Sequence, residues 1–279
     1  MGLTEPLSDG ISAGPMMAKL TDPLGARLLE RTRTFRDRVQ ESGGSIENGS
    51  LENLYDPILR KVKEWGLLSD LVFFGAASAV ETNSGSIATL FDASGNENDA
   101  TQSDSAKQPT DTTDSEFGGR AVALSDGSDD ILTSSLSSHT QPTTHLTLVR
   151  TDDPNTNDQR TISTTGGGDT TPYQTININN GDWVAFAGSQ LRDGSPGSSP
   201  VILSSRFDGT DSIIWRDGTN EVTGDAGTYD IGSQLALLNL PGRTEVFNGP
   251  SAMGLVIAAK LTDHQLSEIE STLTSYYSL

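Results

Sequence analysis

The spacing of apolar residues along the chain changes from helical to alternating near residue 70. Before that point, apolar side chains recur at intervals of three and four, which is the spacing of one face of an amphipathic helix. From Leu71 onward, short runs alternate apolar and polar positions, as in strands with one buried face. The helical spacing returns after residue 260. The pattern therefore predicts a β-rich body with helices at both ends of the chain.

Two helices are predicted before residue 67. The pair Asp22-Pro23 marks the start of the first, because a carboxylate accepts the free amides of a first turn and proline suits the first helical position; Gly43-Gly44 marks its end. Asp56-Pro57 starts the second helix and Gly66 stops it. The apolar faces of the two helices comprise Leu24, Leu28, Phe35, Val39, Ile58, Val62 and Trp65.

The segment between these helices, residues 42–50, is mostly glycine, serine and asparagine, which is typical of a flexible linker. We therefore expect residues 1–66 to form a helical arm for assembly or attachment, and residues 67–279 to form a separate β-sandwich domain. The first helix is too short for its apolar seam to show whether it packs within the molecule or docks on a partner. Both alternatives stay open at this point.

The body is predicted to contain about ten short strands without intervening helices, which favours a β-sandwich. Asn180-Gly181 and Asp217-Gly218 each lie between two alternating runs and predict tight hairpins. Thr262-Asp263 predicts the start of a last helix, whose apolar stripe runs through Leu273 and Tyr276.

The charge of the chain disfavours one class of partner. There are 18 Lys and Arg against 38 Asp and Glu, a formal net charge of -20. Such a protein repels the phosphate backbone, so we expect no nucleic-acid binding. Asp outnumbers Glu by 25 to 13, and Arg outnumbers Lys by 13 to 5. We interpret this bias as adaptation to high salt. In molar salt the Debye length falls to about 3 Å, so the repulsion among densely spaced surface carboxylates is screened. The alternative is an ordinary acidic surface.

The acidic residues are concentrated in the body. Residues 1–64 include nine basic and ten acidic residues, whereas residues 65–279 include nine basic and 28 acidic residues. A near-neutral arm on an acidic body indicates that the arm packs against something while the body meets solvent. The most apolar stretch, Leu71 to Val80, is too short to cross a bilayer, and the first 20 residues lack the pattern of a signal peptide. We expect no membrane insertion.

Three stretches carry a resemblance to a known family. They are DASGNENDATQ at residues 92–102, VALSDGSDDIL at residues 122–132, and Leu261-Thr262-Asp263 with the helix that ends in Tyr276-Tyr277. In this order and spacing they resemble the laminin-G-like, concanavalin A-like jelly-roll domains, over about residues 68–279. Leu124-Ser125 departs from the aromatic start that is usual in the second stretch. The resemblance implies a mainly β jelly-roll sandwich, here with an N-terminal helical arm and a C-terminal helix.

Such domains behind a short helical leader are common in structural proteins of tailed viruses, and the composition makes the chain similar to components of tailed viruses of halophilic archaea. The resemblance implies a peripheral protein on the virion surface in a high-salt environment: a tail fibre, baseplate or capsid turret protein. Its arm would bind other virion proteins, its sandwich would bind a host-surface glycan or glycoprotein, and homo-oligomers are expected. The alternatives are a decoration module without a ligand and a secreted carbohydrate-active enzyme.

Catalytic residues are not evident in the sequence. Glycosidases on this sandwich carry an E-x-D-x-x-E pattern, because two carboxylates must face one cleft. The chain lacks that pattern, and neighbours such as Asp129-Asp130 would point to opposite sides of a strand. We therefore expect no catalytic residues and no enzyme activity.

A calcium site is the one metal site for which the sequence offers candidates. Asp92, Asn96, Asn98 and Asp99 place several oxygen atoms in one short loop, and calcium prefers hard oxygen ligands. The alternative is that these side chains form Asx-turns that shape the loop.

Glycan binding would use an exposed aromatic ring stacked on a sugar, flanked by polar groups. The candidates are Tyr173, Trp183 and Trp215. The alternative for both tryptophans is a place in the core, since one face of each strand is buried.

Overall fold

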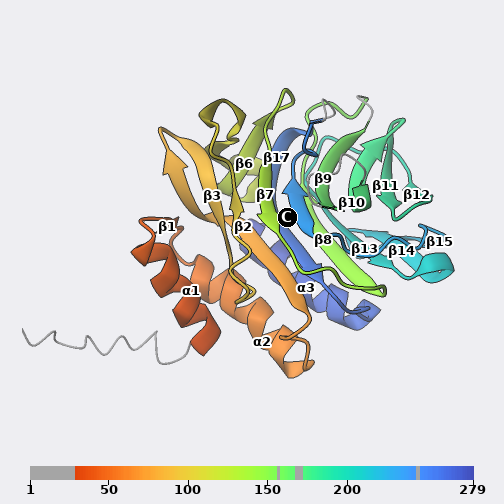
Figure 1. The fold of residues 1–279 in the computed structure, drawn as a ribbon, viewed down its shortest axis with the longest axis horizontal. Coiled ribbons are helices and arrows are strands. Elements are labelled where there is room, and N and C mark those ends of the chain that lie inside the picture. The colour runs from red at the N-terminus through yellow and green to blue at the C-terminus, as the bar shows by residue number, and fades with distance from the viewer. Residues whose placement is uncertain (1–28, 156–157, 167–171, 243–245) are drawn as a thin grey trace, which may run out of the picture.

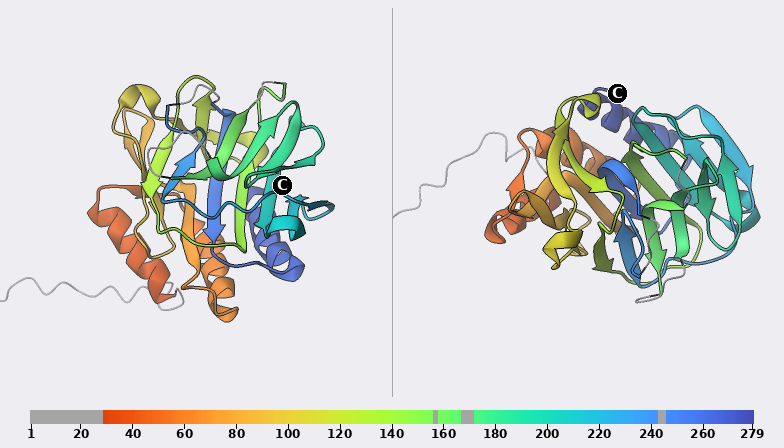
Figure 2. Two further views of the ribbon diagram at one scale, coloured as in Figure 1. Left: turned by 45° about the vertical axis from the view of Figure 1, so that its right-hand side comes forward. Right: turned by 90° about the horizontal axis from the view of Figure 1, so that it is seen from above.

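The structure is a computed structural model that describes residues 29–155, 158–166, 172–242 and 246–279. Its strands form two layers, and the helices pack on the outside of one layer (Figures 1 and 2). The expected helix start at Asp22-Pro23 and the side chains of Leu24 and Leu28 lie outside the described residues.

The end of the first helix and both ends of the other two lie close to the residues that the sequence indicates. They are α1 (Glu30–Glu41), α2 (Asp56–Glu64), which follows a π-helical turn (Leu51–Tyr55), and α3 (Asp263–Tyr277). Pro57 lies in the first turn of α2, as predicted. Thr262 and Gln265 form a capping box at the start of α3, which satisfies two free backbone amides.

The first sheet lies under the helices. Its strands, in spatial order, are β1 (Ser45–Ile46), β2 (Leu71–Asn83), β17 (Asn248–Ile257), β8 (Thr143–Val149), β13 (Val201–Phe207), β14 (Ser212–Arg216) and β15 (Asn220–Gly224). Two further strands, β5 (Thr110–Asp114) and β6 (Arg120–Asp126), continue this sheet beside the start of β17.

The second sheet forms the other layer. Its strands, in spatial order, are β3 (Ser86–Asp92), β4 (Ala100–Thr101), β7 (Leu132–Ser135), β16 (Gln234–Leu237), β9 (Gln159–Thr165), β10 (Pro172–Asn179), β11 (Asp182–Phe186) and β12 (Gln190–Asp193). The pairing of β2 with β3 links the two layers. The fold is therefore a mainly β sandwich.

Both predicted hairpins are confirmed. β10 pairs with β11 around Asn180-Gly181, and β14 pairs with β15 around Asp217-Gly218. All four turn residues have positive φ, which is what a two-residue turn of this kind requires.

Alternation along the strands divides the buried residues between two cores. In β13, Ile202 faces the helices while its neighbour Leu203 faces the second sheet. The core between helices and first sheet contains Phe35, Tyr55, Phe74, Leu255, Leu273 and Tyr277. The core between the two sheets contains Phe73, Ile162, Trp183, Phe207, Phe247 and Val256.

The structure corrects the division into a separate arm and body. Phe35, Val39, Ile58 and Val62 are buried in the core on the first sheet, and Trp65 packs against it half-buried. These side chains therefore make intramolecular contacts, and residues 30–66 belong to the same folded unit as the sandwich. Attachment to a partner through this region stays a prediction.

The expected linker is also part of this unit. Ser45 and Ile46 pair with β2, and a Cβ atom on Gly44 would lie 2.4 Å from the ring of Phe91, so the chain runs tightly against the sandwich here. The carboxylate of Glu47 accepts a hydrogen bond of 2.9 Å from the hydroxyl of Tyr276 on α3. Residues 42–50 are therefore an ordered connection that includes a short strand, and their composition alone does not predict this.

In the described part of the chain, no helix is both long and apolar enough to cross a bilayer.

Candidate functional site

Three aromatic rings gather on the outer face of the second sheet. Tyr173 on β10 lies 5.9 Å from Tyr229, and Phe186 on β11 lies 6.2 Å from Tyr229, measured between ring centroids. Phe186 points outward because it alternates with Ala185, whose side chain packs between the sheets. Tyr173 and Phe186 are half-buried, while 45% of Tyr229 is exposed. We call these three residues the aromatic cluster.

The loop before β16 holds Tyr229 in a fixed position. The backbone amide of Tyr229 donates to the carbonyl of Ala187 at 2.8 Å. Its own carbonyl accepts from the side-chain amides of Gln141 and Gln174, at 2.8 and 2.7 Å. A Cβ atom on Gly227, which has φ of 98°, would lie 2.2 Å from the carbonyl oxygen of Ala187. The backbone behind the exposed ring is therefore anchored before any ligand arrives, which lowers the entropic cost of binding.

The two tryptophans proposed for glycan binding do not reach the surface. Trp183 is 1% exposed in the core between the sheets. Trp215 is 9% exposed in the core under the helices, with the guanidinium of Arg206 5.7 Å from its ring. Neither ring can stack on a sugar, so the core alternative holds for both.

Of the three glycan candidates, only Tyr173 lies in the aromatic cluster. Sequence reasoning missed Phe186, which reads as one more apolar strand residue, and Tyr229, which stands alone in a polar loop. The isolation of Tyr229 was the available signal, because nothing near it in sequence predicts a buried strand or helix.

Asp92 forms hydrogen bonds that leave no room for calcium. Its side chain is fully buried, and its carboxylate accepts from the backbone amides of Phe74, Ser94 and Asn98 at 2.9, 2.8 and 3.0 Å. It also accepts from the Ser94 hydroxyl at 2.5 Å. Burial raises the pKa of Asp92, and these four donors oppose that rise. A cation cannot occupy positions that N–H and O–H groups already fill.

The other three calcium candidates also shape the backbone. Asp99 accepts from the backbone amide of Asp92 at 2.8 Å and pairs with Arg38 at 2.5 Å. The side-chain amides of Asn96 and Asn98 donate to the carbonyls of Leu71 and Val72 at 2.7 and 2.8 Å. The loop is therefore an Asx-type turn that ties β3 to β2, as the alternative states, and the calcium expectation does not fit this geometry.

Carboxylates do converge elsewhere. Within the described ranges, Asp126, Asp129 and Asp130 form the one group of three whose ligand atoms all lie within 4.8 Å of one another. Asp126 is exposed, and one Asp130 oxygen accepts from the backbone amide of Asp126 at 3.0 Å. We assign no metal to this turn, because an exposed acidic turn of this kind is ordinary on a chain with 38 acidic residues.

A buried acid lines a pocket of about 540 Å³ between α3 and the β14–β15 hairpin. Glu270 is 6% exposed, and its nearest hydrogen-bond partner is the Ser204 hydroxyl at 3.5 Å. Burial and the nearby charge of Asp217 raise the pKa of Glu270 to about 7. Asp217 lines the same pocket, and burial raises its pKa as well. The pocket therefore contains a carboxyl group that is partly protonated at neutral pH.

No protein-family model matches the chain, and no curated protein sequence matches it at a significant level. Solved structures do resemble its fold. A GH54 α-L-arabinofuranosidase has a TM-score of 0.55 at 9% identity, over 69% of this chain and 51% of that one. A structure of botulinum neurotoxin type C, whose cell entry depends on interaction with two ganglioside molecules, has a TM-score of 0.52 at 12% identity, over 75% of this chain and 53% of that one. The sialidase of Trypanosoma rangeli has a TM-score of 0.50 at 14% identity, over 78% of this chain and 38% of that one.

The comparisons overturn the expectation that the chain is not an enzyme. The same fold occurs in chains of an arabinofuranosidase and a sialidase, so the missing E-x-D-x-x-E pattern excludes one arrangement of carboxylates rather than catalysis as such. The chain spans about half or less of the length of these three proteins. At these identities the likeness establishes the fold, and the chain shares a β-rich, lectin-like sandwich with them.

Proposed function

We propose that the chain is a peripheral virion protein whose laminin-G-like jelly-roll sandwich binds a neutral glycan through the aromatic cluster. The observation that carries the glycan assignment is the exposed Tyr229 ring beside Tyr173 and Phe186, on a loop fixed by hydrogen bonds. An aromatic face on a rigid loop is what stacks on the apolar face of a pyranose.

The charge around the aromatic cluster favours a sugar without an acid group. Asp225 and Asp230 flank Tyr229 in its loop and are exposed. The whole chain carries a formal net charge of -20. An anionic sugar would be repelled by this surface, most strongly at low salt. A neutral hexose or pentose meets no such barrier.

The glycan assignment is tested by calorimetric titration of neutral oligosaccharides selected on a glycan array. Replacing Tyr229→Ala should weaken binding roughly tenfold or more, the usual effect of removing an aromatic anchor. Leu279→Ala is the matched control, since Tyr229 and Leu279 are the two exposed large apolar side chains among the described residues. Equal affinity of the Tyr229→Ala variant, or an array without any neutral ligand, would reject the assignment.

The virion assignment is supported by the resemblance of the sequence and by its charge distribution. It includes a high-salt environment, homo-oligomers, and a contact between residues 1–66 and other virion proteins. Immunogold labelling of purified particles from a lysing culture tests it. Label on tail tips, baseplates or capsid vertices is the expected result, and particles without label would reject this part while leaving the glycan assignment untouched.

A second candidate function is hydrolysis of a glycosidic bond, and one observation favours it. Glu270, with a pKa of about 7, and Asp217 line one open pocket. A carboxyl group that keeps its proton near neutral pH can act as a general acid, and a second carboxylate can act as nucleophile or base. Release of nitrophenol from nitrophenyl glycosides tests this; activity should be lost in both Glu270→Gln and Asp217→Asn.

A further inference from the structure

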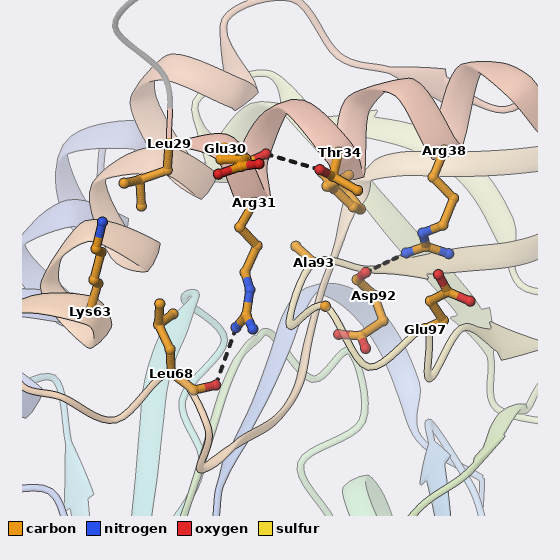
Figure 3. Close-up of a pocket in the computed structure, with 12 residues that line it drawn as sticks. Leu29, Glu30, Arg31, Thr34, Arg38, Lys63, Leu68, Asp92, Ala93 and Glu97 are labelled. Atoms are coloured by element: carbon orange, nitrogen blue, oxygen red, sulfur yellow. Dashed lines mark hydrogen bonds between the residues drawn. The ribbon is translucent and has the colours of Figure 1, made fainter.

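A pocket lies on the helix-covered side of the first sheet, away from the aromatic cluster. It is a pocket of about 410 Å³ between α1, Lys63 on α2 and the loop after β3 (Figure 3). Its apolar lining comes from Leu29, Phe35, Leu68 and Ala93. This volume is within the range of small-molecule sites, and the pocket combines these apolar side chains with six charged ones.

Two cations that line this pocket have no ion-pair partner in the part of the chain that the structure describes. The guanidinium of Arg31 donates to the carbonyl of Leu68 at 3.2 Å, and the structure shows no carboxylate bonded to it. Lys63, across the pocket in Figure 3, has neither a hydrogen bond nor an ion pair among the described residues. By contrast, Lys61 on the same helix pairs with Glu268 at 2.5 Å.

This arrangement is unusual for a chain with 38 acidic and 18 basic residues, in which a cation readily finds a carboxylate. Arg31 is also held in place: a Cβ atom on Gly95, which has φ of 88°, would lie 2.8 Å from its Nε. The third cation of the pocket, Arg38, is already bonded to Asp99. Arg31 is thus positioned, and neither Arg31 nor Lys63 has a bonded carboxylate among the described residues.

The acidic groups of the pocket form no ion pair with Arg31 or Lys63 among the described residues. Burial lowers the pKa of Arg31 and the charge of Asp92 opposes this lowering, but four donors already bond to the buried Asp92 carboxylate. Glu30 and Glu97 also line the pocket, but both are exposed, where water and salt screen their charge.

We propose that this pocket binds an amphipathic carboxylate, whose anionic group pairs with Arg31 and Lys63 and whose apolar part packs on Leu29, Phe35, Leu68 and Ala93. An ion pair in a partly desolvated pocket supplies the orientation, and the apolar lining supplies contact area. The site is separate from the aromatic cluster, so the proposal does not depend on the glycan assignment.

Phenylacetate is the test ligand, and phenylacetamide is its neutral isostere. Both are titrated into the full-length protein at one fixed salt concentration, with amide chemical shifts as the readout. Phenylacetate should shift the amides of Ala93 and Gly95 and bind roughly tenfold more tightly than phenylacetamide, the usual gain from one charge-assisted contact. Equal affinities, or no shifts at these two amides, would overturn the proposal.

Variants separate the two cations from general charge. Lys63→Gln should weaken phenylacetate binding severalfold, and because Lys63 is exposed this variant should fold normally. Arg31→Gln should weaken it further. Lys107→Gln is the control, since Lys107 is a half-exposed lysine that does not line the pocket. Wild-type affinity in both pocket variants, or an equal loss in the control, would assign the effect to overall charge and reject the site.

Discussion

The outer faces of the two sheets show how similar residue types serve different purposes. On the first sheet, the ring of Tyr55 is buried between Phe35 and Phe74, with its centroid 4.8 Å from that of Phe35 and 5.1 Å from that of Phe74. On the second sheet, Tyr229 stands beside two half-buried rings and remains 45% exposed, although its backbone is firmly bonded. The covered face explains stability and the open face suggests binding. Amphipathic helices in a segment of near-neutral charge are therefore weak evidence that the segment binds a partner.

The largest effect should come from removing the cover of the first sheet. A chain without residues 1–64 loses α1, α2 and Tyr55, and it exposes Phe74 to water. Loss of so much buried apolar area exceeds the usual stability of a domain, so we expect no cooperative unfolding transition. Thermal melts followed by near-ultraviolet circular dichroism measure this.

A milder version keeps the chain length. Tyr55→Ala deletes a fully buried ring and should lower the free energy of unfolding by about 3 to 5 kcal/mol, as for other large-to-small core changes. A truncated chain that still melts cooperatively would restore the division into an independent arm and body.

Most of the fold was accessible from the sequence because local chemistry determines it. Pro57 and Thr262 fix helix starts, and Asn180-Gly181 fixes a hairpin, each through its own backbone geometry. The packing of residues 30–66 was not accessible, because apolar spacing shows that a helix has a buried face without showing what covers it. Composition also misled for residues 42–50, where β1 pairs with β2.

The site was less predictable than the fold. Tyr173, Phe186 and Tyr229 are spread over 57 positions, and only sheet pairing and one loop bring them together. Trp183 and Trp215 have the aromatic rings that glycan binding needs, yet their strand positions point inward. Whether a ring is exposed depends on tertiary packing, which the local sequence pattern does not predict.

The next effect in size should come from Asp92, which belongs to the covered side. Asp92→Asn replaces one acceptor oxygen with an NH₂ group that faces other donors, and it removes the charge that strengthens the remaining bonds. We expect a loss of about 3 kcal/mol in the free energy of unfolding, measured by urea denaturation.

Calcium provides the contrasting measurement for the same loop. Because Asp92 and Asp99 already accept from protein donors, millimolar calcium should leave the Tm of the wild-type protein unchanged. A clear rise in Tm that disappears in Asp92→Asn would contradict the structural role and reinstate a metal site.

A smaller effect is expected at Glu270, and it should depend on pH. The pKa of Glu270 is raised from 4.5 to about 7 in the folded protein, so the folded state binds more protons than the unfolded state between these values. The wild-type protein therefore loses stability as pH rises through this window. Glu270→Gln removes that loss and should be more stable by about 2 to 3 kcal/mol at pH 8, with little difference at pH 4.

Urea denaturation at the two pH values measures this difference. Glu268→Gln is the control on the same helix, because its carboxylate pairs with Lys61, which lowers the pKa of Glu268. That variant should show no gain at pH 8. A Glu270→Gln variant with the same stability difference at both pH values would show that Glu270 titrates like an exposed acid.

The smallest effect on stability should come from Tyr229, on the open face. Tyr229→Ala removes a ring that is 45% exposed and leaves the backbone bonds of its loop in place, so the free energy of unfolding should change by no more than about 0.5 kcal/mol. Tyr173→Ala should cost more, because its ring is half-buried against the sheet. Both are measured by urea denaturation beside Tyr55→Ala. If Tyr229→Ala destabilises the protein as much as Tyr55→Ala, its ring serves packing and the contrast between the two faces fails. If it leaves stability unchanged while removing glycan binding, the open face is a binding surface on a frame held by the covered one.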